Sequence, residues 1–422
     1  MKLLCAPRGF DASAFKSTQR VVLFETGKPG RDVHAGAAVI SRVKRGGMVV
    51  DPVAWDLVAI ALSAFAADSH GLRSNSPDGW TREFELTIAV QYPEIWNPLA
   101  GELSQALAFL STDRWSFHFI SGGCKPPVPS KPRVQDLDAA VLLSGGLDSL
   151  IGALDLSADG KALLAVSKLV RGDGDRQKMY SKLTCKDHQV FNDSTKTLRR
   201  AESSQRTRSL LFISFGVLAS TSLARYHRKE GATLYLCENG FIAINPPLTG
   251  LRLGSLSTRT AHPVFLASLS RVIEGAGIDV VIENPYRHKT KGEMLKECRN
   301  QIELAKFATD STSCGRFQKF NYRHCGRCIP CQVRRASFHA WGEIEDDTFY
   351  VYDQLGIDNS ERARFDDVRA VAMAIRSAKA DFNGWLGNAL GSPDVPDRPA
   401  LRDMLERGIN ELAMFHAHLD VQ

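Results

Sequence analysis

The sequence has no run that approaches the roughly 20 consecutive apolar residues that a transmembrane helix requires. Its first residues carry Arg8 and Gly9, where a secretory signal would have a longer apolar stretch. We therefore expect a cytoplasmic protein with no membrane segment. The chain also lacks internal repeats, and its 44% hydrophobic and 24% charged residues exclude a disordered or fibrous protein. Its 422 residues exceed one ordinary core, which predicts two or three structural units.

The nine cysteines do not have the spacing of a disulfide framework. Four of them lie between Cys314 and Cys331, and disulfides are rare in a reducing compartment, so this cluster indicates a metal site. Cys314 is followed by ten residues and then by Cys325, Cys328 and Cys331, and four thiolates suit tetrahedral zinc. Such a closed set leaves no open position for water, so the zinc would be structural. An iron–sulfur cluster is the alternative, and the adjacent His324 is interpreted as a bystander.

The net charge of +6 permits an anionic partner. A nucleotide such as ATP meets this condition as well as a nucleic acid does. Nucleic acid therefore stays open as a partner, but the charge does not require it.

A proline-rich segment divides the chain. Residues Ser121–Pro132 contain four prolines, two glycines and two serines, which cannot continue a helix or a central strand. We predict an interdomain linker over residues 121–135. Residues 1–120 are then expected to form a small N-terminal α+β domain, residues 136–346 an α/β domain, and residues 347–422 a helical C-terminal region.

Each of these regions has expected elements. In the first domain they are helices over Pro52–Ala67 and Pro98–Leu110 and strands over Phe84–Val90 and Trp115–Ile120. In the helical region they are Phe365–Ala380 and Pro399–His418. Four large aromatic side chains of the first domain could form a recognition surface or lie in its core: Trp55, Trp80, Trp96 and Trp115.

After residue 135, short apolar strands alternate with longer amphipathic helices. This alternation predicts a parallel sheet with helices on both faces. Ligands of such sheets bind beyond the carboxyl ends of the strands. The expected strands are Ala139–Leu143, Ala162–Val166, Thr233–Cys237 and Ile278–Ile282. The expected helices are Leu150–Leu156, Arg208–Tyr226, Pro263–Gly275 and Lys291–Phe307.

A glycine-rich loop follows the first of these strands and opens the next helix. It consists of Ser144, Gly145, Gly146, Leu147, Asp148 and Ser149. Two adjacent glycines let the backbone approach a phosphate, and exposed amides with the helix dipole favour the anion. Asp148 would hold the loop or the Mg²⁺ that accompanies ATP. The Gly-Lys-Ser ending of Walker loops is absent, and a plain structural turn is the alternative to a phosphate site.

The loop and the cysteines together resemble the 7-cyano-7-deazaguanine synthase (QueC) family of PP-loop enzymes, which combines an SGGLDS loop with a late zinc site. The matching residues are Ser144–Ser149, Ser313-Cys314 and Cys325-Gly326-Arg327-Cys328-Ile329-Pro330-Cys331-Gln332-Val333-Arg334. The resemblance covers residues 138–338. It implies that ATP is cleaved between its α- and β-phosphates, and that a 7-carboxy-7-deazaguanine is activated and converted with ammonia into a nitrile.

The chain departs from the housekeeping form of that family. Residues 1–135 and the helical tail are not explained, and the segment Lys168–Lys196 is longer and more basic. The extended form, with the elements Gly79-Trp80-Thr81-Arg82 and Asp113-Arg114-Trp115, is similar to QueC-like proteins of bacterial anti-phage systems, particularly the QatC type. In that branch an amine of an operon-encoded partner protein could replace ammonia.

Three candidate substrate-binding residues follow a predicted strand. Glu238, Asn239 and Gly240 fall at the carboxyl edge of the sheet, where they could pair with the edge of a deazapurine. A plain turn is the competing interpretation, because Asn-Gly is a strong turn signal.

Three cations are further candidates. Arg259, in the polar segment of residues 257–260, could contact phosphates, or that segment could cap the helix that follows. Arg208 and Lys291 begin predicted helices and could face the nucleotide and its leaving pyrophosphate, or lie on solvated surfaces.

The motifs lead to one favoured function and two alternatives. We expect an ATP- and Mg²⁺-dependent ligase in which Asp148, Ser149, Arg259 and Lys291 act in catalysis, with a structural Zn²⁺. A catalytically inactive nucleotide-binding scaffold in a defence complex is one alternative. A PP-loop enzyme that acts on tRNA is the other.

Overall fold

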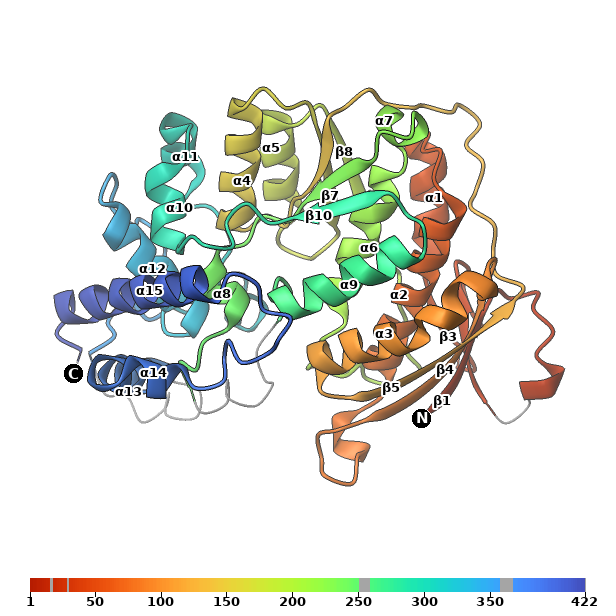
Figure 1. The fold of residues 1–422 in the computed structure, drawn as a ribbon, viewed down its shortest axis with the longest axis horizontal. Coiled ribbons are helices and arrows are strands. Elements are labelled where there is room, and N and C mark those ends of the chain that lie inside the picture. The colour runs from red at the N-terminus through yellow and green to blue at the C-terminus, as the bar shows by residue number, and fades with distance from the viewer. Residues whose placement is uncertain (16–17, 29, 250–258, 357–366, 422) are drawn as a thin grey trace.

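Two parallel β-sheets organise the fold (Figure 1). The computed structural model describes residues 1–422 except 16–17, 29, 250–258, 357–366 and 422. The first sheet contains β1 (Lys2–Ala6), β2 (Gln19–Leu23), β3 (Val33–Ala35), β4 (Glu83–Val90) and β5 (Arg114–Ser121), in the order β3-β2-β1-β4-β5. The second contains β6 (Ala139–Leu142), β7 (Leu163–Lys168), β8 (Asp187–Phe191), β9 (Ala232–Tyr235) and β10 (Val280–Glu283), in the order β10-β9-β6-β7-β8.

Both sheets have the same strand order when each is counted from its own first strand. That order is third, second, first, fourth, fifth, as in doubly wound nucleotide-binding folds. The predicted parallel sheet after residue 135 is confirmed. The predicted α+β domain over residues 1–120 is wrong, because that region also folds around an all-parallel sheet. Its first three strands have at most five residues each, too few to produce a clear pattern.

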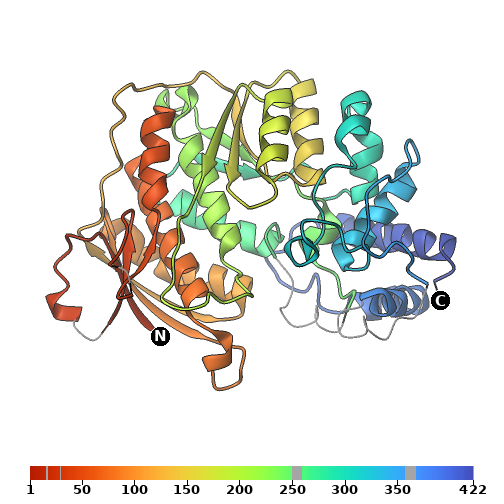
Figure 2. The ribbon, with the colours of Figure 1, turned by 180° about the vertical axis from the view of Figure 1, so that it is seen from behind.

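Helices from both halves of the chain form the layer between the sheets (Figures 1 and 2). Those of the first half pack against those of the second, and one hydrophobic core runs through them, including Trp55, Leu142 and Phe215. The connecting residues 122–138, all of which the structure describes, contain no helix or extended strand. The two sheets therefore share a core. The helices of this layer are α2 (Pro52–His70), α3 (Pro93–Ser111), α6 (Arg208–Ser220) and α9 (Pro263–Gly275).

The opposite face of the second sheet has its own helices. Ala140 and Leu142 of β6 point into the shared core, whereas Ala139 and Val141 point into a second core on the other side. A parallel strand that is buried on both faces reads as a continuous apolar run, which is why the pattern was recognised in the sequence. The helices on this face are α4 (Leu147–Ala158), α5 (Gly174–Thr184), α10 (Lys291–Glu297) and α11 (Gln301–Phe307).

Two long helices expected from the sequence are interrupted. The helix expected over Arg208–Tyr226 ends at Ser220, and α7 (Ala224–His227) follows as a separate turn. The helix expected over Lys291–Phe307 divides into α10 and α11. Asn300 starts α11, where its side chain accepts a hydrogen bond from Glu303 N at 3.1 Å, as an N-cap does.

The C-terminal helices lie at the opposite end of the molecule from the first sheet (Figures 1 and 2). They surround a third core that includes Phe241 and Val264. The expected helix over Pro399–His418 is confirmed, and the expected start at Phe365 lies outside the described residues. The helices of this region are α8 (Gly240–Ile244), α12 (Ile329–Trp341), α13 (Asp367–Ala380), α14 (Phe382–Leu386) and α15 (Arg398–His418).

The prediction that no segment approaches the length and hydropathy of a membrane span is wrong for helix α2. It has 19 residues, and its most apolar window has a mean hydropathy of 1.3. It is the one helix of this kind in the described part of the chain, and 89% of that window is buried inside the protein. Trp55 of α2 is fully buried, as is Trp96, and Trp115 is 7% exposed. The core interpretation of the tryptophans therefore holds for these three.

A buried ion network joins α2 to the rest of the first half. Asp113 accepts hydrogen bonds from Arg73 Nη1 at 3.0 Å and from Arg82 Nη2 at 2.6 Å. Arg82 Nη2 also donates to Asp68 Oδ1 at 2.6 Å, and Asp68 Oδ2 accepts from Thr207 N at 2.8 Å. The side chains of both aspartates are inaccessible to solvent. Each buried charge is thus paired, and Asp68 connects the network to the start of α6.

We expect Asp113→Ala to lower the free energy of unfolding by about 3–5 kcal/mol, because two buried guanidinium groups lose a shared carboxylate. Urea unfolding followed by circular dichroism measures the change. Glu85→Ala is the control, since its ion pair with Lys2 at 2.9 Å is exposed and should contribute at most about 1 kcal/mol. Equal stabilities of the two variants would contradict the role given to the network.

Candidate functional site

The glycine-rich loop lies between β6 and α4 at the carboxyl edge of the second sheet. Gly145 has a φ of +89°, in the left-handed region that favours glycine, and Gly146 is the N-cap of α4. A Cβ on Gly146 would lie 3.1 Å from the carbonyl oxygen of Thr312. The first glycine is thus required by the backbone conformation and the second by the close approach of another segment.

Hydroxyl groups order the loop from within. Gly146 N donates to Ser144 Oγ at 3.2 Å, and Ser149 Oγ donates to Gly146 O at 2.9 Å. The two hydroxyl oxygens lie 3.2 Å apart. Gln177 of α5 donates to Ser144 O at 3.2 Å and fixes the loop from outside. Both hydroxyls therefore lie at the start of α4, where free N–H groups and the helix dipole favour an anion.

Asp148 forms a buried ion pair with Lys291. Lys291 Nζ donates to Asp148 Oδ1, and Asp148 Oδ2 accepts from Asn239 N at 3.2 Å and from Asn239 Nδ2 at 2.7 Å. Asp148 is 6% exposed and Lys291 7%. Charges this deeply buried need such partners, because an isolated one would be strongly destabilising. The structure thus brings two of the predicted catalytic residues together, from α4 and α10.

A cavity of about 220 Å³ lies beside this ion pair. Typical small-molecule sites measure roughly 300–1,000 Å³, so this cavity can hold a small group or one part of a larger ligand. Its walls come from the loop, from the end of β9, from α10 and from the cysteine-rich region. The lining residues include Ser144, Gly146, Leu147, Asp148, Ser149, Glu238, Lys291, Thr312, Ser313 and Pro330.

Of the three residues predicted to bind substrate, Glu238 lines the cavity, whereas Asn239 and Gly240 do not. Asn239 Oδ1 accepts from Ile242 N at 3.0 Å and caps α8, while its amide group holds Asp148. A Cβ on Gly240 would lie 2.1 Å from the carbonyl oxygen of Arg287. Asn239 therefore supports the site and caps α8, and Gly240 is the first residue of that helix, so the two residues do not form the plain turn of the competing interpretation.

Glu238 has an unusual proton affinity. Burial raises the pKa of its carboxyl group, and the negative charge of Asp148 raises it further, whereas Lys291 lowers it. Together these effects raise the pKa to about 7. A carboxyl group with such a pKa changes charge near neutral pH. It is therefore the titrating group of the cavity.

Arg208 lies near a residue that supports the loop. It is the exposed first residue of α6. Burial raises the pKa of Asp173, and the charges of Arg176 and Arg208 oppose this shift. Asp173 in turn accepts from Thr312 Oγ1 at 3.0 Å. Arg208 is thus within electrostatic reach of the segment that contacts the loop.

Arg259 lies elsewhere. Its Nη1 donates to Phe109 O at 2.8 Å, and its guanidinium lies 4.6 Å from the centre of the Phe109 ring. It is not among the residues that line the cavity. It connects the segment that precedes α9 to α3 instead. Residues 257 and 258 of the same polar segment lie outside the described part of the chain.

The four clustered cysteines form a buried group whose sulfur atoms all lie within 4.8 Å of one another. The Sγ atoms of Cys314 and Cys328 are 3.9 Å apart, as are those of Cys325 and Cys331. A tetrahedron with Zn–S bonds of about 2.3 Å has edges of about 3.8 Å, so the cluster can bind zinc. His324 is not a member, and its Nε2 accepts from Ser313 N at 3.2 Å.

One short segment joins the cysteine cluster to the phosphate loop. Thr312 N donates to Gly145 O at 3.2 Å, Ser313 lines the cavity, and Cys314 belongs to the cluster. The fully buried side chain of Arg334, in α12, donates to Ser311 Oγ at 2.7 Å and so holds the start of the same segment. A metal bound by the cysteines would therefore fix one wall of the cavity.

Comparison with known proteins does not add to this description. The chain matches no protein-family model, no curated protein and no solved structure. The function of the site is therefore argued from its own residues.

Three supporting residues were missed in the sequence: Thr312, Asp173 and Gln177. Thr312 directly precedes the predicted Ser313-Cys314 pair, and this was its only signal. Asp173 is the N-cap residue of α5 and Gln177 lies within it, and the apolar pattern did not predict this helix because most of its residues are polar. Their contacts with the loop arise from tertiary packing.

The purified protein should contain about one zinc ion per chain, and Cys328→Ser should lose the metal and stability, because binding at a closed site contributes folding energy. Elemental analysis and thermal unfolding measure both. Cys185→Ser, outside the cluster, should retain the metal. Iron with acid-labile sulfide, or a metal-free wild type, would show that the zinc assignment is wrong.

Proposed function

We propose that this protein is a cytoplasmic enzyme that uses ATP to activate a carboxylate of the 7-carboxy-7-deazaguanine type and joins it to a nitrogen nucleophile. The observation that carries the proposal is the cavity that residues of the Ser144–Ser149 loop and Lys291 line together, with Lys291 paired to Asp148 of that loop. A glycine turn at a helix start is an anion site, and a buried lysine beside it adds a fixed positive charge. The choice of substrate follows from the resemblance of the motifs.

In this proposal the phosphates of ATP bind at the loop. Backbone N–H groups at the start of α4 and the hydroxyls of Ser144 and Ser149 would donate to phosphate oxygens. Arg208 would add positive charge at the rim. The cavity of about 220 Å³ would hold the phosphates, and the nucleoside would extend out of it along the carboxyl edge of the sheet.

The residues present also fit Mg²⁺. Proteins usually bind this ion through one or two carboxylates together with substrate phosphates. Asp148 and Glu238 are the two carboxylates that line the cavity. Asp148 Oδ2 accepts two hydrogen bonds from Asn239, whereas Oδ1 accepts one from Lys291 and has a second lone pair with which it could bind the ion. The ion would neutralise phosphate charge when bound.

The chemistry proceeds in two steps. An oxygen of the substrate carboxylate attacks the α-phosphorus, the bond from this phosphorus to the bridging oxygen breaks, and pyrophosphate leaves. Lys291 is positioned to stabilise the charge of the leaving group. The nitrogen nucleophile then attacks the acyl carbon, loses a proton and displaces AMP. With ammonia the product is a primary amide, which a second activation could dehydrate to a nitrile. With an amine of a partner protein the product is an N-substituted amide, which cannot be dehydrated to a nitrile.

The catalytic assignments follow the positions of the side chains. Asp148 and Ser149 would order the loop, Asp148 would also bind Mg²⁺, and Lys291 would supply the cation. Arg259 is left out of this set, because it packs on Phe109 away from the cavity lining.

We expect Lys291→Ala to reduce pyrophosphate release from ATP, in the presence of 7-carboxy-7-deazaguanine and ammonium, by about 10²–10³-fold, as removal of a fixed electrostatic stabiliser does. Lys289→Ala is the matched control, since this lysine pairs with Glu297 at 2.7 Å and does not line the cavity. A wild type that releases no pyrophosphate with either ammonium or amines would overturn the proposed function. Equal rates in both lysine variants would overturn the assigned site.

Activity should rise with pH through about 7, because the pKa of Glu238 is raised to that value and its carboxylate is needed to hold Mg²⁺. Below this pH the group is protonated and neutral. Glu238→Gln should give a lower rate with no ionisation in this range. Pyrophosphate release measured between pH 5.5 and 8.5 tests this, and an unchanged inflection in the variant would assign the titration to another group.

A further inference from the structure

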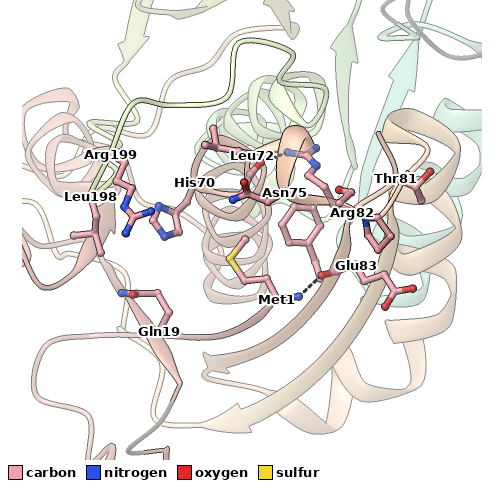
Figure 3. A pocket seen from close by; sticks show the side chains of 14 residues that line it. Met1, Gln19, His70, Leu72, Asn75, Thr81, Arg82, Glu83, Leu198 and Arg199 are labelled. Carbon is pink, nitrogen blue, oxygen red and sulfur yellow. Dashed lines mark hydrogen bonds between the residues drawn. The ribbon is translucent and has the colours of Figure 1, made fainter. Parts of the chain in front are cut away.

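We propose that a second cavity, which the proposed function does not use, binds a small organic anion with a flat apolar body. The cavity has a volume of about 590 Å³, within the roughly 300–1,000 Å³ that small-molecule sites occupy. It lies at the amino edge of the first sheet, where β2 begins at Gln19 and β4 begins at Glu83 (Figure 3). The phosphate loop is at the carboxyl edge of the other sheet, so the two cavities are separate.

Two distant parts of the chain build the walls. Leu72 and Phe84 come from the first half, and Leu198 comes from the segment between β8 and α6 (Figure 3). A Cβ on Gly71 would lie 2.9 Å from the Phe84 ring, so glycine at this position lets the ring lie against the chain. These side chains provide apolar surface for a flat ligand.

Most charges at the cavity are already paired. Glu83 is the one carboxylate among its lining residues, and its Oε1 lies 2.7 Å from Arg114 Nη1. Arg82 is buried and bonded to Asp68 and Asp113, each at 2.6 Å. Neither group is available as the main partner of a ligand.

Among the side chains, Arg199 and His70 are the exception, and the Met1 ammonium, which also lines the cavity, donates to Glu83 O. The Arg199 side chain is exposed and makes no ion pair with the residues that the structure describes. Figure 3 shows its guanidinium beside the His70 ring at one end of the cavity. His70 Nδ1 is buried and has no hydrogen-bond partner in the described part of the chain. Burial, and after it the charge of Arg199, lower the pKa of His70, so the ring is neutral near pH 7.

An anion at this end would satisfy both groups. Its charge would pair with Arg199, and one of its oxygens would accept from His70 Nδ1–H once the partly buried ring turns this nitrogen toward the cavity. A cation would be repelled by Arg199, and an uncharged apolar molecule would leave the buried nitrogen without a partner. The remaining space between Leu72, Phe84 and Leu198 then accepts the apolar body.

The fluorescent anion 8-anilinonaphthalene-1-sulfonate is a suitable probe, because it joins a sulfonate to a flat aromatic system. We expect saturable binding to the full-length protein, weakened by about tenfold in Arg199→Glu and changed by less than about twofold in Arg200→Glu. Arg200 is exposed and does not line the cavity, so the two variants carry the same change in net charge. The NMR signal of the His70 ring, assigned with His70→Gln, should shift when the probe is added.

Each other result contradicts the proposal. Equal binding by Arg199→Glu and Arg200→Glu would show that the probe senses only net charge or another apolar surface. Displacement of the probe by ATP with no shift of the His70 signal would place it at the phosphate loop. Absence of saturable binding to the wild type would show that the cavity does not take this class of ligand.

Discussion

The hydrogen bond from Thr312 N to Gly145 O ties the cysteine cluster to the phosphate loop, and the geometry of the candidate site depends on it. A glycine with positive φ has no side chain to fix its conformation, so the loop needs support from outside. Thr312 supplies that support, and Cys314 two residues later belongs to the cluster. A metal bound by the cysteines would thus affect the cavity without lining it, because it would order the segment that holds the loop.

A second constraint is the shared core. Helices α2 and α6 pack against each other, so the first half of the chain covers the helices that lie on one face of the second sheet. This arrangement explains why Trp55 and Trp96 are buried and unavailable as a recognition surface. It also means that removal of the first half would expose an apolar face, and function cannot be assigned to that half by deletion.

The sequence predicts features that depend on neighbouring residues and not those that depend on packing. The strand, glycine turn and helix around Gly145 were predicted, because each has a local pattern. The cysteine cluster was predicted because its spacing is diagnostic. Strands β4 and β5 of the first sheet were predicted, but its other strands and its all-parallel order were missed, because strands such as Val33–Ala35 are too short to show alternation. Arg259 was misplaced because a polar segment before a helix has the same composition whether it faces a nucleotide or another helix.

The segment between β8 and α6 links the two cavities. It contributes Leu198 and Arg199 to the cavity of the first sheet and ends at Thr207, whose N–H donates to the buried Asp68. The next residue, Arg208, begins α6. A ligand that orders this segment would therefore also restrict the start of α6. This path couples the two cavities only if the segment has two arrangements to which the ligands bind with different affinities. The coupling is then reciprocal: ATP would change the affinity for the anion by the same factor as the anion changes the affinity for ATP.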